Sequence, residues 1–262
     1  MHGIWPMAAL TLVLSTLLWG GFLALLSRER RYLWLLLPGL PLSALVNRLV
    51  KAPLGASVGR WSAIEPGLGR ETPLWFILFL FMLAPVCEEV IKVAPLLLSP
   101  IRRLVTSPRT GLWAGMGLGL SFGLGEALYL AYGIAQSSEY ADLPWYLFTG
   151  YAGERLAVTL VHGLMTALFT YGLARGWLEG LAGYAAAVGF HALINSGALF
   201  YQLGLVKAGI AQIPYLATIF LLVFVFERVR RGMHVRDEME GADEIVYFRR
   251  GEGSPREPDS QT

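Results

Sequence analysis

Residues 73–98 read PLWFILFLFMLAPVCEEVIKVAPLLL, an apolar run that is interrupted by two glutamates and a lysine. A membrane-spanning helix needs about 20 consecutive, mostly apolar residues, and this run is long enough. Glu88, Glu89 and Lys92 have apolar residues on both sides. A charge at the bilayer centre costs roughly 2.5–3.5 kcal/mol on insertion scales, so such groups usually face the interior of a bundle and mark a site. The run therefore predicts a spanning helix that carries a buried polar site.

The rest of the chain predicts a membrane protein of one helical domain. Hydrophobic residues make up 55% of the chain and charged residues 15%, whereas soluble domains usually carry about 25% charged residues. The sequence predicts an all-α, polytopic transmembrane helix bundle of about seven spans over residues 1–226. Residues 227–262 are charged and poor in apolar side chains, so we expect a flexible cytoplasmic tail there. The other apolar stretches of spanning length are 4–26, 32–50, 110–135, 152–174, 177–201 and 209–226.

Composition also excludes several classes of function. A net charge of only +2 does not favour a nucleic-acid partner, and a single cysteine excludes an internal disulfide framework and a cysteine metal cage. No basic segment precedes the apolar run at 4–26, and no clear cleavage site follows it. We therefore expect this run to be retained as the first helix.

The distribution of arginines predicts the orientation of the bundle. Placing the N-terminus outside and the tail inside puts most arginines near the helix ends in the cytoplasm, as the positive-inside rule requires. The loop at 136–154, with Glu139 and Asp142 beside Trp145, then fits an outer face with interfacial aromatic residues. The basic residues that this arrangement leaves on the outer side are Arg48, Lys51, Arg60, Arg70, Arg155 and Lys207.

The charged trio in the 73–98 run has a spacing that suits acid–base chemistry. Lys92 follows Glu88 by four residues and Glu89 by three, so one ammonium could reach both carboxylates along a helix face. Neutralising one carboxylate leaves the other free to accept a proton, as a general base for water activation does. The alternative is a charge cluster at a helix end that reaches the membrane surface. Apolar residues on both sides of the trio oppose that alternative.

A stripe of glycines precedes another carboxylate in the 110–135 run. Gly115, Gly119 and Gly123 recur every four residues, a spacing that lets a second helix approach closely. Glu126 follows on nearly the same face. We expect the Glu126 carboxylate to point at a close neighbour, the 73–98 helix.

Two later helices carry histidines in otherwise apolar surroundings. His162 lies in the 152–174 run, and His191 and Asn195 lie four residues apart on one face of the 177–201 run. A single membrane histidine is more often a hydrogen-bond partner between helices than a catalyst. Together with the three glutamates, these residues predict one polar cavity near the bilayer midplane.

The motifs resemble those of the PrsW family of intramembrane proteases. The resemblance covers residues from about 84 to 200 and rests on four motifs in order on four helices. The closing histidine motif is also similar to that of the CAAX-type prenyl-protein proteases. Departures are Ala127, where PrsW-type sequences often have Asn, and Asn195, where they often have Asp. The motifs are Glu88-Glu89-x-x-Lys92, Phe122-x-x-x-Glu126, His162-Gly163-Leu164-Met165 and His191-x-x-x-Asn195.

The resemblance implies hydrolysis of a peptide bond in a membrane-anchored protein, within a prokaryotic cell membrane. One of Glu88 and Glu89 would activate water, with Glu88 favoured, and Lys92 would hold the other charged. His191 and Asn195 would stabilise the oxyanion, while Glu126 and His162 would relay protons or bind a metal. No cofactor is required by this mechanism. If zinc is present, the ligands implied are Glu89, Glu126, His162 and His191.

Two other classes of function fit the same residues. A carboxylate-lined ion or proton transporter would use the three glutamates to bind a cation, although the chain lacks the matching halves typical of transporters. A non-catalytic protein that binds a partner's membrane helix would use the cavity without chemistry. The partners expected in every case are the lipid bilayer and a membrane protein or ion, and no nucleic acid.

Overall fold

The protein's structure is a computed structural model that describes residues 3–64 and 72–251, with side chains described as far as residue 233. In these residues the chain forms helices and turns and no strand, which confirms the all-α prediction. The α-helices are α1 (Ile4–Ser27), α2 (Leu42–Val46), α3 (Ala52–Trp61), α4 (Leu74–Lys92), α5 (Ser99–Arg102), α6 (Pro108–Ala135), α7 (Thr149–Leu173), α8 (Trp177–Gln202) and α9 (Ala208–Gly251). The shorter 3-10 and π turns are η1 (Arg30–Leu36), η2 (Asn47–Lys51), η3 (Ala94–Leu97), η4 (Ser138–Tyr140) and η5 (Trp145–Phe148).

Six helices of the described residues are long and apolar enough to cross a membrane. The chain is thus a multi-pass membrane protein, as its composition predicts. Each of the six coincides with one of the predicted spans. They are Ile4–Ser27, Leu74–Leu97, Pro108–Ala135, Trp145–Leu173, Trp177–Gln202 and Ala208–Met233.

The remaining predicted span, 32–50, is not a single helix, and the structure corrects this expectation, since the described residues contain six candidate spans. Six spans place both ends of a bundle on one side of the membrane, so they do not support the predicted arrangement with the N-terminus outside and the tail inside. The segment is η1, a turn, α2 and the π turn η2 in succession. Pro38 and Pro41 lie at the break, and proline both removes a backbone donor and disfavours a helical residue before it. The freed N–H of Gly39 donates to Oγ of Ser121 at 2.8 Å, so the break is anchored to α6.

Close packing of α6 against α7 forms the centre of the bundle. The glycine stripe of α6 meets α7. A Cβ at Gly123 would lie 2.7 Å from Cα of Thr159, and one at Gly119 would overlap the carbonyl of His162. Thr170 donates to the carbonyl of Gly111 at 2.8 Å, which adds a hydrogen bond to this contact. The stripe therefore places α7, and His162 with it, directly against α6.

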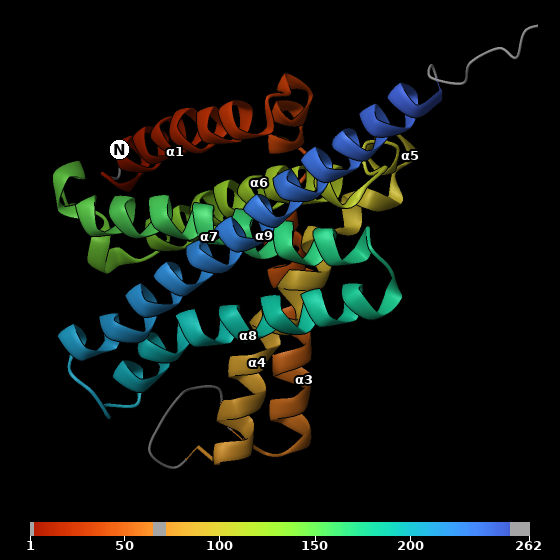
Figure 1. Cartoon of the computed structure of the whole chain (residues 1–262). Coiled ribbons are helices and arrows are strands. Elements are labelled where there is room, and N and C mark those ends of the chain that lie inside the picture. The colour runs from red at the N-terminus through yellow and green to blue at the C-terminus, as the bar shows by residue number, and fades with distance from the viewer. Residues whose placement is uncertain (1–2, 65–71, 252–262) are drawn as a thin grey trace, which may run out of the picture. The chain divides into compact units, whose positions relative to one another are not determined.

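Helix α1 lies alongside α6 (Figure 1). The start of α1 packs on the end of α6 through a buried cluster that includes Ile4, Met7 and Ala131. The indole N–H of Trp19 donates to the carbonyl of Leu156 at 2.8 Å, which joins α1 to α7. The start of α1 and the end of α6 therefore share one end of the bundle.

A helical hairpin of α3 and α4 lies across the direction of α6 and α8 in the view of Figure 1. A Cβ at Gly59 would lie 3.5 Å from Phe76 and one at Gly55 3.4 Å from Leu80, so the two helices run antiparallel. The hydroxyl of Tyr184 in α8 donates to the carbonyl of Val86 at 3.1 Å. This contact brings the second half of α4 against the first half of α8.

The chain divides into two compact units, Met1–Leu222 and Val223–Thr262. The division lies close to the boundary that the sequence predicts after residue 226. Helix α9 belongs to both units, and residues 227–251 are helical. Residues 252–262 lie outside the described residues, so the flexibility of the tail stays a prediction.

The glycine contact generates a prediction about stability. Gly119→Ala should lower the free energy of unfolding by about 1–3 kcal/mol, because the added methyl overlaps the α7 backbone and forces the helices apart. Gly133→Ala on the same helix is the matched control, since a Cβ there meets nothing within 4 Å. Equilibrium unfolding in mixed detergent micelles measures both. Equal stability of Gly119→Ala and the wild type would contradict the packing.

Candidate active site

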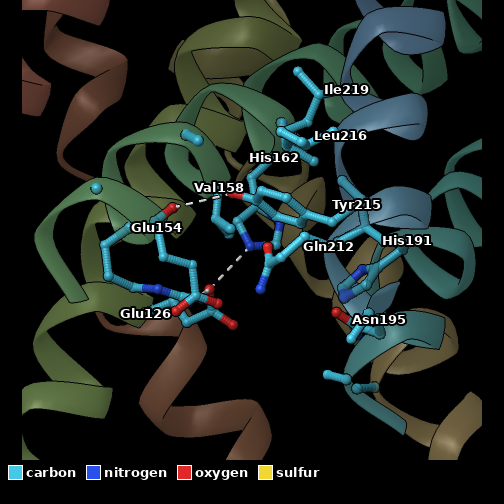
Figure 2. A pocket seen from close by; sticks show the side chains of 18 of the residues that line it. Glu126, Glu154, Val158, His162, His191, Asn195, Gln212, Tyr215, Leu216 and Ile219 are labelled. Atoms are coloured by element: carbon cyan, nitrogen blue, oxygen red, sulfur yellow. Dashed lines mark hydrogen bonds and ion pairs between the residues drawn. The ribbon is translucent and has the colours of Figure 1, made fainter. Parts of the chain in front are cut away.

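A cavity of about 800 Å³ lies in the first unit, and five of the seven predicted site residues line it. Its wall is built from α4, α6, α7, α8, the π turn η2 and the 208–222 part of α9. Figure 2 shows Glu126 and His162 on one side of this space and His191 with Asn195 on the other. The predicted residues in the wall are Glu88, Glu126, His162, His191 and Asn195.

The other two predicted residues, Glu89 and Lys92, form a fully buried ion pair behind the wall. Nζ of Lys92 lies 2.5 Å from Oε1 of Glu89, and both side chains have an exposed fraction of 0%. Nδ1 of His191 lies 2.6 Å from the same carboxylate oxygen. The Lys92 ammonium also lies 5.0 Å from the centroid of the Phe122 ring. Glu89 therefore joins α4 to α8, and Lys92 joins α4 to α6.

Glu88 has a different cation, which corrects the expectation that Lys92 serves both carboxylates. Nζ of Lys51 in η2 lies 2.6 Å from Oε1 of Glu88. Consecutive residues of an α-helix point about 100° apart, so the two glutamates of α4 meet different neighbours. Oε2 of Glu88 is buried and has no hydrogen-bond partner. It lies 3.8 Å from Nε2 of His191, which is beyond direct hydrogen-bond distance.

Glu126 binds two side chains of α7. Its Oε2 lies 2.8 Å from Nη1 of Arg155 and 3.1 Å from Nε2 of His162. Figure 2 marks the contact with His162. Arg155 also pairs with the neighbouring Glu154 at 2.6 Å. An oxygen of its carboxylate also lies within 4.8 Å of one of Glu88, so Glu126 points toward the 73–98 helix as expected, while its ion pairs are with α7.

The two histidines lie together at the centre of the site. Their ring centroids are 5.5 Å apart in an edge-to-face arrangement, and Phe122 packs on His162 at 5.2 Å. Both imidazoles are buried. Asn195 lies one helical turn after His191, so its carboxamide faces the same cavity.

The hydrogen bonds assign the tautomers of the rings. A carboxylate only accepts hydrogen bonds, so Nδ1 of His191 donates to Glu89 and Nε2 of His162 donates to Glu126. In the neutral rings the opposite nitrogens are acceptors. Nε2 of His191 and Nδ1 of His162 are therefore the nitrogens free to accept a proton.

Sequence reasoning missed two cations of the site, Lys51 and Arg155. Their partners are Glu88 and Glu126. No sequence signal links these residues, because Lys51 is 37 residues from Glu88 and Arg155 is 29 residues from Glu126. With Lys92 on Glu89, each of the three predicted glutamates has a cation partner.

Two sets of side chains bring donor atoms within 4.8 Å of one another, and each could hold a metal ion. Carboxylate oxygens and imidazole nitrogens are ligands that zinc accepts. Oε2 of Glu88, Oε2 of Glu89 and Nδ1 of His162 are buried and lack hydrogen-bond partners, so each set retains donors that are not already used. The sets are Glu89 with His162 and His191, and Glu88 with Glu126 and His162.

Comparisons of the chain with protein-family models, with curated proteins and with solved structures gave no match. The function is therefore inferred from the residues of the cavity and their geometry.

The buried pair generates a prediction about stability. Lys92→Met should lower the free energy of unfolding by about 3–5 kcal/mol, because it leaves the Glu89 carboxylate buried without its cation. Adding Glu89→Gln should recover much of that loss, since the charge that needed the cation is gone. Equilibrium unfolding of the single and double variants measures this coupling. The exposed pair of Glu227 with Arg231 is the control, because surface pairs contribute about 0–1 kcal/mol. Additive losses in the Lys92 and Glu89 variants would contradict the pairing.

Proposed function

We propose that the protein is an intramembrane endopeptidase of the PrsW type that hydrolyses a peptide bond of a membrane-anchored protein. The observation that supports this most is the state of Glu88. Its side chain is 2% exposed, it lines a cavity, and one of its oxygens has no partner. A buried carboxylate oxygen left free next to a space for substrate is suited to accept a proton from water.

The two adjacent glutamates have different roles in this proposal. Oε1 of Glu89 accepts from both Lys92 and His191, and its side chain lies behind the cavity wall. Glu89 therefore orients His191 and holds the site together. Glu88 is the general base, because it alone of the two lines the cavity.

The attacking water lies between Glu88 and His191. The free oxygen of Glu88 and Nε2 of His191 are both acceptors and lie 3.8 Å apart. A water molecule has two O–H donors, so it can bond to both atoms and turn a lone pair toward the substrate. Glu88 takes one proton as the water oxygen attacks the carbonyl carbon of the peptide. This changes the role of His191, for which the resemblance implied oxyanion stabilisation.

The remaining steps use Asn195 and the protonated Glu88. The carboxamide N–H groups of Asn195 stabilise the oxyanion of the tetrahedral intermediate, and one such donor is worth about a hundred- to a thousandfold in rate. The C–N bond then breaks, and the protonated Glu88 returns its proton to the leaving amine. Glu126 and His162 form a second hydrogen-bonded pair beside this centre.

The part of the cavity lined by α9 suits a transmembrane substrate. The wall contributed by α9 includes Ala211, Leu216 and Ile219, which are apolar, next to the polar Gln212. An apolar wall beside a polar centre suits a membrane segment whose backbone unwinds at the carboxylates. The partner is therefore a membrane-anchored protein within the bilayer.

A zinc ion held by either donor set would supply Lewis-acid activation of the same water. The steps above use only side chains of the chain itself. A chelator added to the cleavage assay distinguishes the two versions, because loss of activity that zinc restores would place a metal at this centre.

The proposal predicts the behaviour of two glutamine variants. Glu88→Gln should reduce cleavage of a single-span substrate by about a hundred- to ten-thousandfold while the protein stays folded, because glutamine keeps the shape but cannot accept a proton. Glu89→Gln should lower both activity and stability, since it disrupts the bond to His191 and the pair with Lys92. Purified protein in detergent or liposomes is used for both measurements. Glu179→Gln, an exposed glutamate at the start of α8, is the control.

Full activity of Glu88→Gln would overturn the assignment of the base. Ion flux through liposomes by a protein that cleaves no substrate would support the carboxylate-lined transporter. Absence of both activities would favour a binding protein.

A further inference from the structure

Lys51 belongs to none of the motifs that predict the site, yet it contacts the residue at its centre. It is the last residue of the π turn η2, Asn47–Lys51, between α2 and α3. Single π turns are rare and often occur at functional sites, because the extra residue in the turn redirects the side chains that follow. Here the turn ends at the residue that reaches the cavity wall.

The contact is with one oxygen of Glu88 only. Nζ of Lys51 lies 2.6 Å from Oε1, while Oε2 is buried without a partner. A charge-assisted hydrogen bond of this kind is directional and stronger than a neutral one. It restricts rotation of the carboxylate and so determines which oxygen is left free beside His191.

The other cations of the site cannot replace Lys51. Lys92 is 2.5 Å from Glu89 and fully buried. Arg155 is divided between Glu126 and Glu154. Removal of Lys51 therefore takes the cation partner from Glu88, whereas Glu89 and Glu126 keep theirs.

We propose that Lys51 is a positioning residue that holds Oε1 of Glu88 so that Oε2 is aimed at the attacking water. This inference rests on the proposed function, because it assigns a purpose to the free oxygen of the base. Lys51 acts through Glu88 and does not contact the peptide bond that breaks. Its effect is therefore on the chemical step and not on substrate binding.

The test compares Lys51→Met with Lys51→Arg in the cleavage of a single-span substrate by the full-length purified protein. Lys51→Met should lower kcat by about ten- to a hundredfold with KM nearly unchanged, the scale for a misplaced catalytic group. Lys51→Arg keeps a charged donor and should lose about tenfold less than Lys51→Met. The matched control is Arg48→Met, which removes a charge from the same π turn. Arg48 lies over the ring of Tyr132 at 5.2 Å and does not pair with Glu88.

An unchanged kcat in Lys51→Met, or an equal loss in Arg48→Met, would overturn the proposal. So would a rise in KM that accounts for the whole effect, because it would place Lys51 in substrate binding.

A second measurement separates this inference from the proposed function. The unfolding midpoints of Lys51→Met, Glu88→Gln and the double variant test the pair without any substrate. The double variant should lose less than the sum of the single losses, because a neutral carboxamide in place of the Glu88 carboxylate no longer needs a cation. Additive losses would overturn the pairing itself. The wild type could also cleave no substrate while the stability losses of the Lys51 and Glu88 variants are non-additive. That result would overturn the proposed protease function and, with it, the positioning role of Lys51.

Discussion

A carboxylate inside a membrane bundle has to be matched by a cation, and this constraint determines how the bundle is assembled. Glu89 has the shortest of these contacts, to Lys92 and His191, and all three side chains are buried. Loss of one partner from such a group is costly, because the remaining charge stays desolvated. The contact fixes α4 against α8 and so determines where Glu88, the adjacent residue on the helix, points. The proposed chemistry depends on this arrangement. Lys92 and His191 bond to Glu89, so neither of them occupies the second oxygen of Glu88.

The packing of α6 on α7 supplies the other half of the site. The glycines of α6 bring the backbones together, and this close approach carries His162 to within 3.1 Å of Glu126. The two halves meet where His162 and His191 pack ring to ring. A helix contact made largely of glycines thus positions the polar centre. Stability and function are therefore linked at the same residues of α6 and α7.

Much of this could be predicted from the sequence, for identifiable physical reasons. Apolar runs of spanning length predict helices because the backbone must satisfy its own hydrogen bonds in lipid. Glu88, Glu126 and His191 could be chosen because ionisable residues inside such runs face the interior. The partners could not be chosen, since Lys51 is 37 residues from Glu88 and Arg155 is 29 from Glu126. The sequence predicts a span at 32–50 because this segment is apolar and long enough. Composition alone does not show that Pro38 and Pro41 interrupt the helix there. Which helix the glycine stripe meets depends on tertiary packing, and small residues recur on several helices.

The central claim is that Glu88 activates a water molecule that attacks the peptide bond directly. A single-turnover cleavage in water enriched with oxygen-18, with enzyme in excess over a single-span substrate, tests it by mass spectrometry of the product. Direct attack predicts that the new C-terminal carboxylate contains one oxygen-18 atom in the first turnover. A product that contains only oxygen-16 in that turnover would contradict the account, because a side-chain carboxylate would then have attacked the peptide and donated its own oxygen.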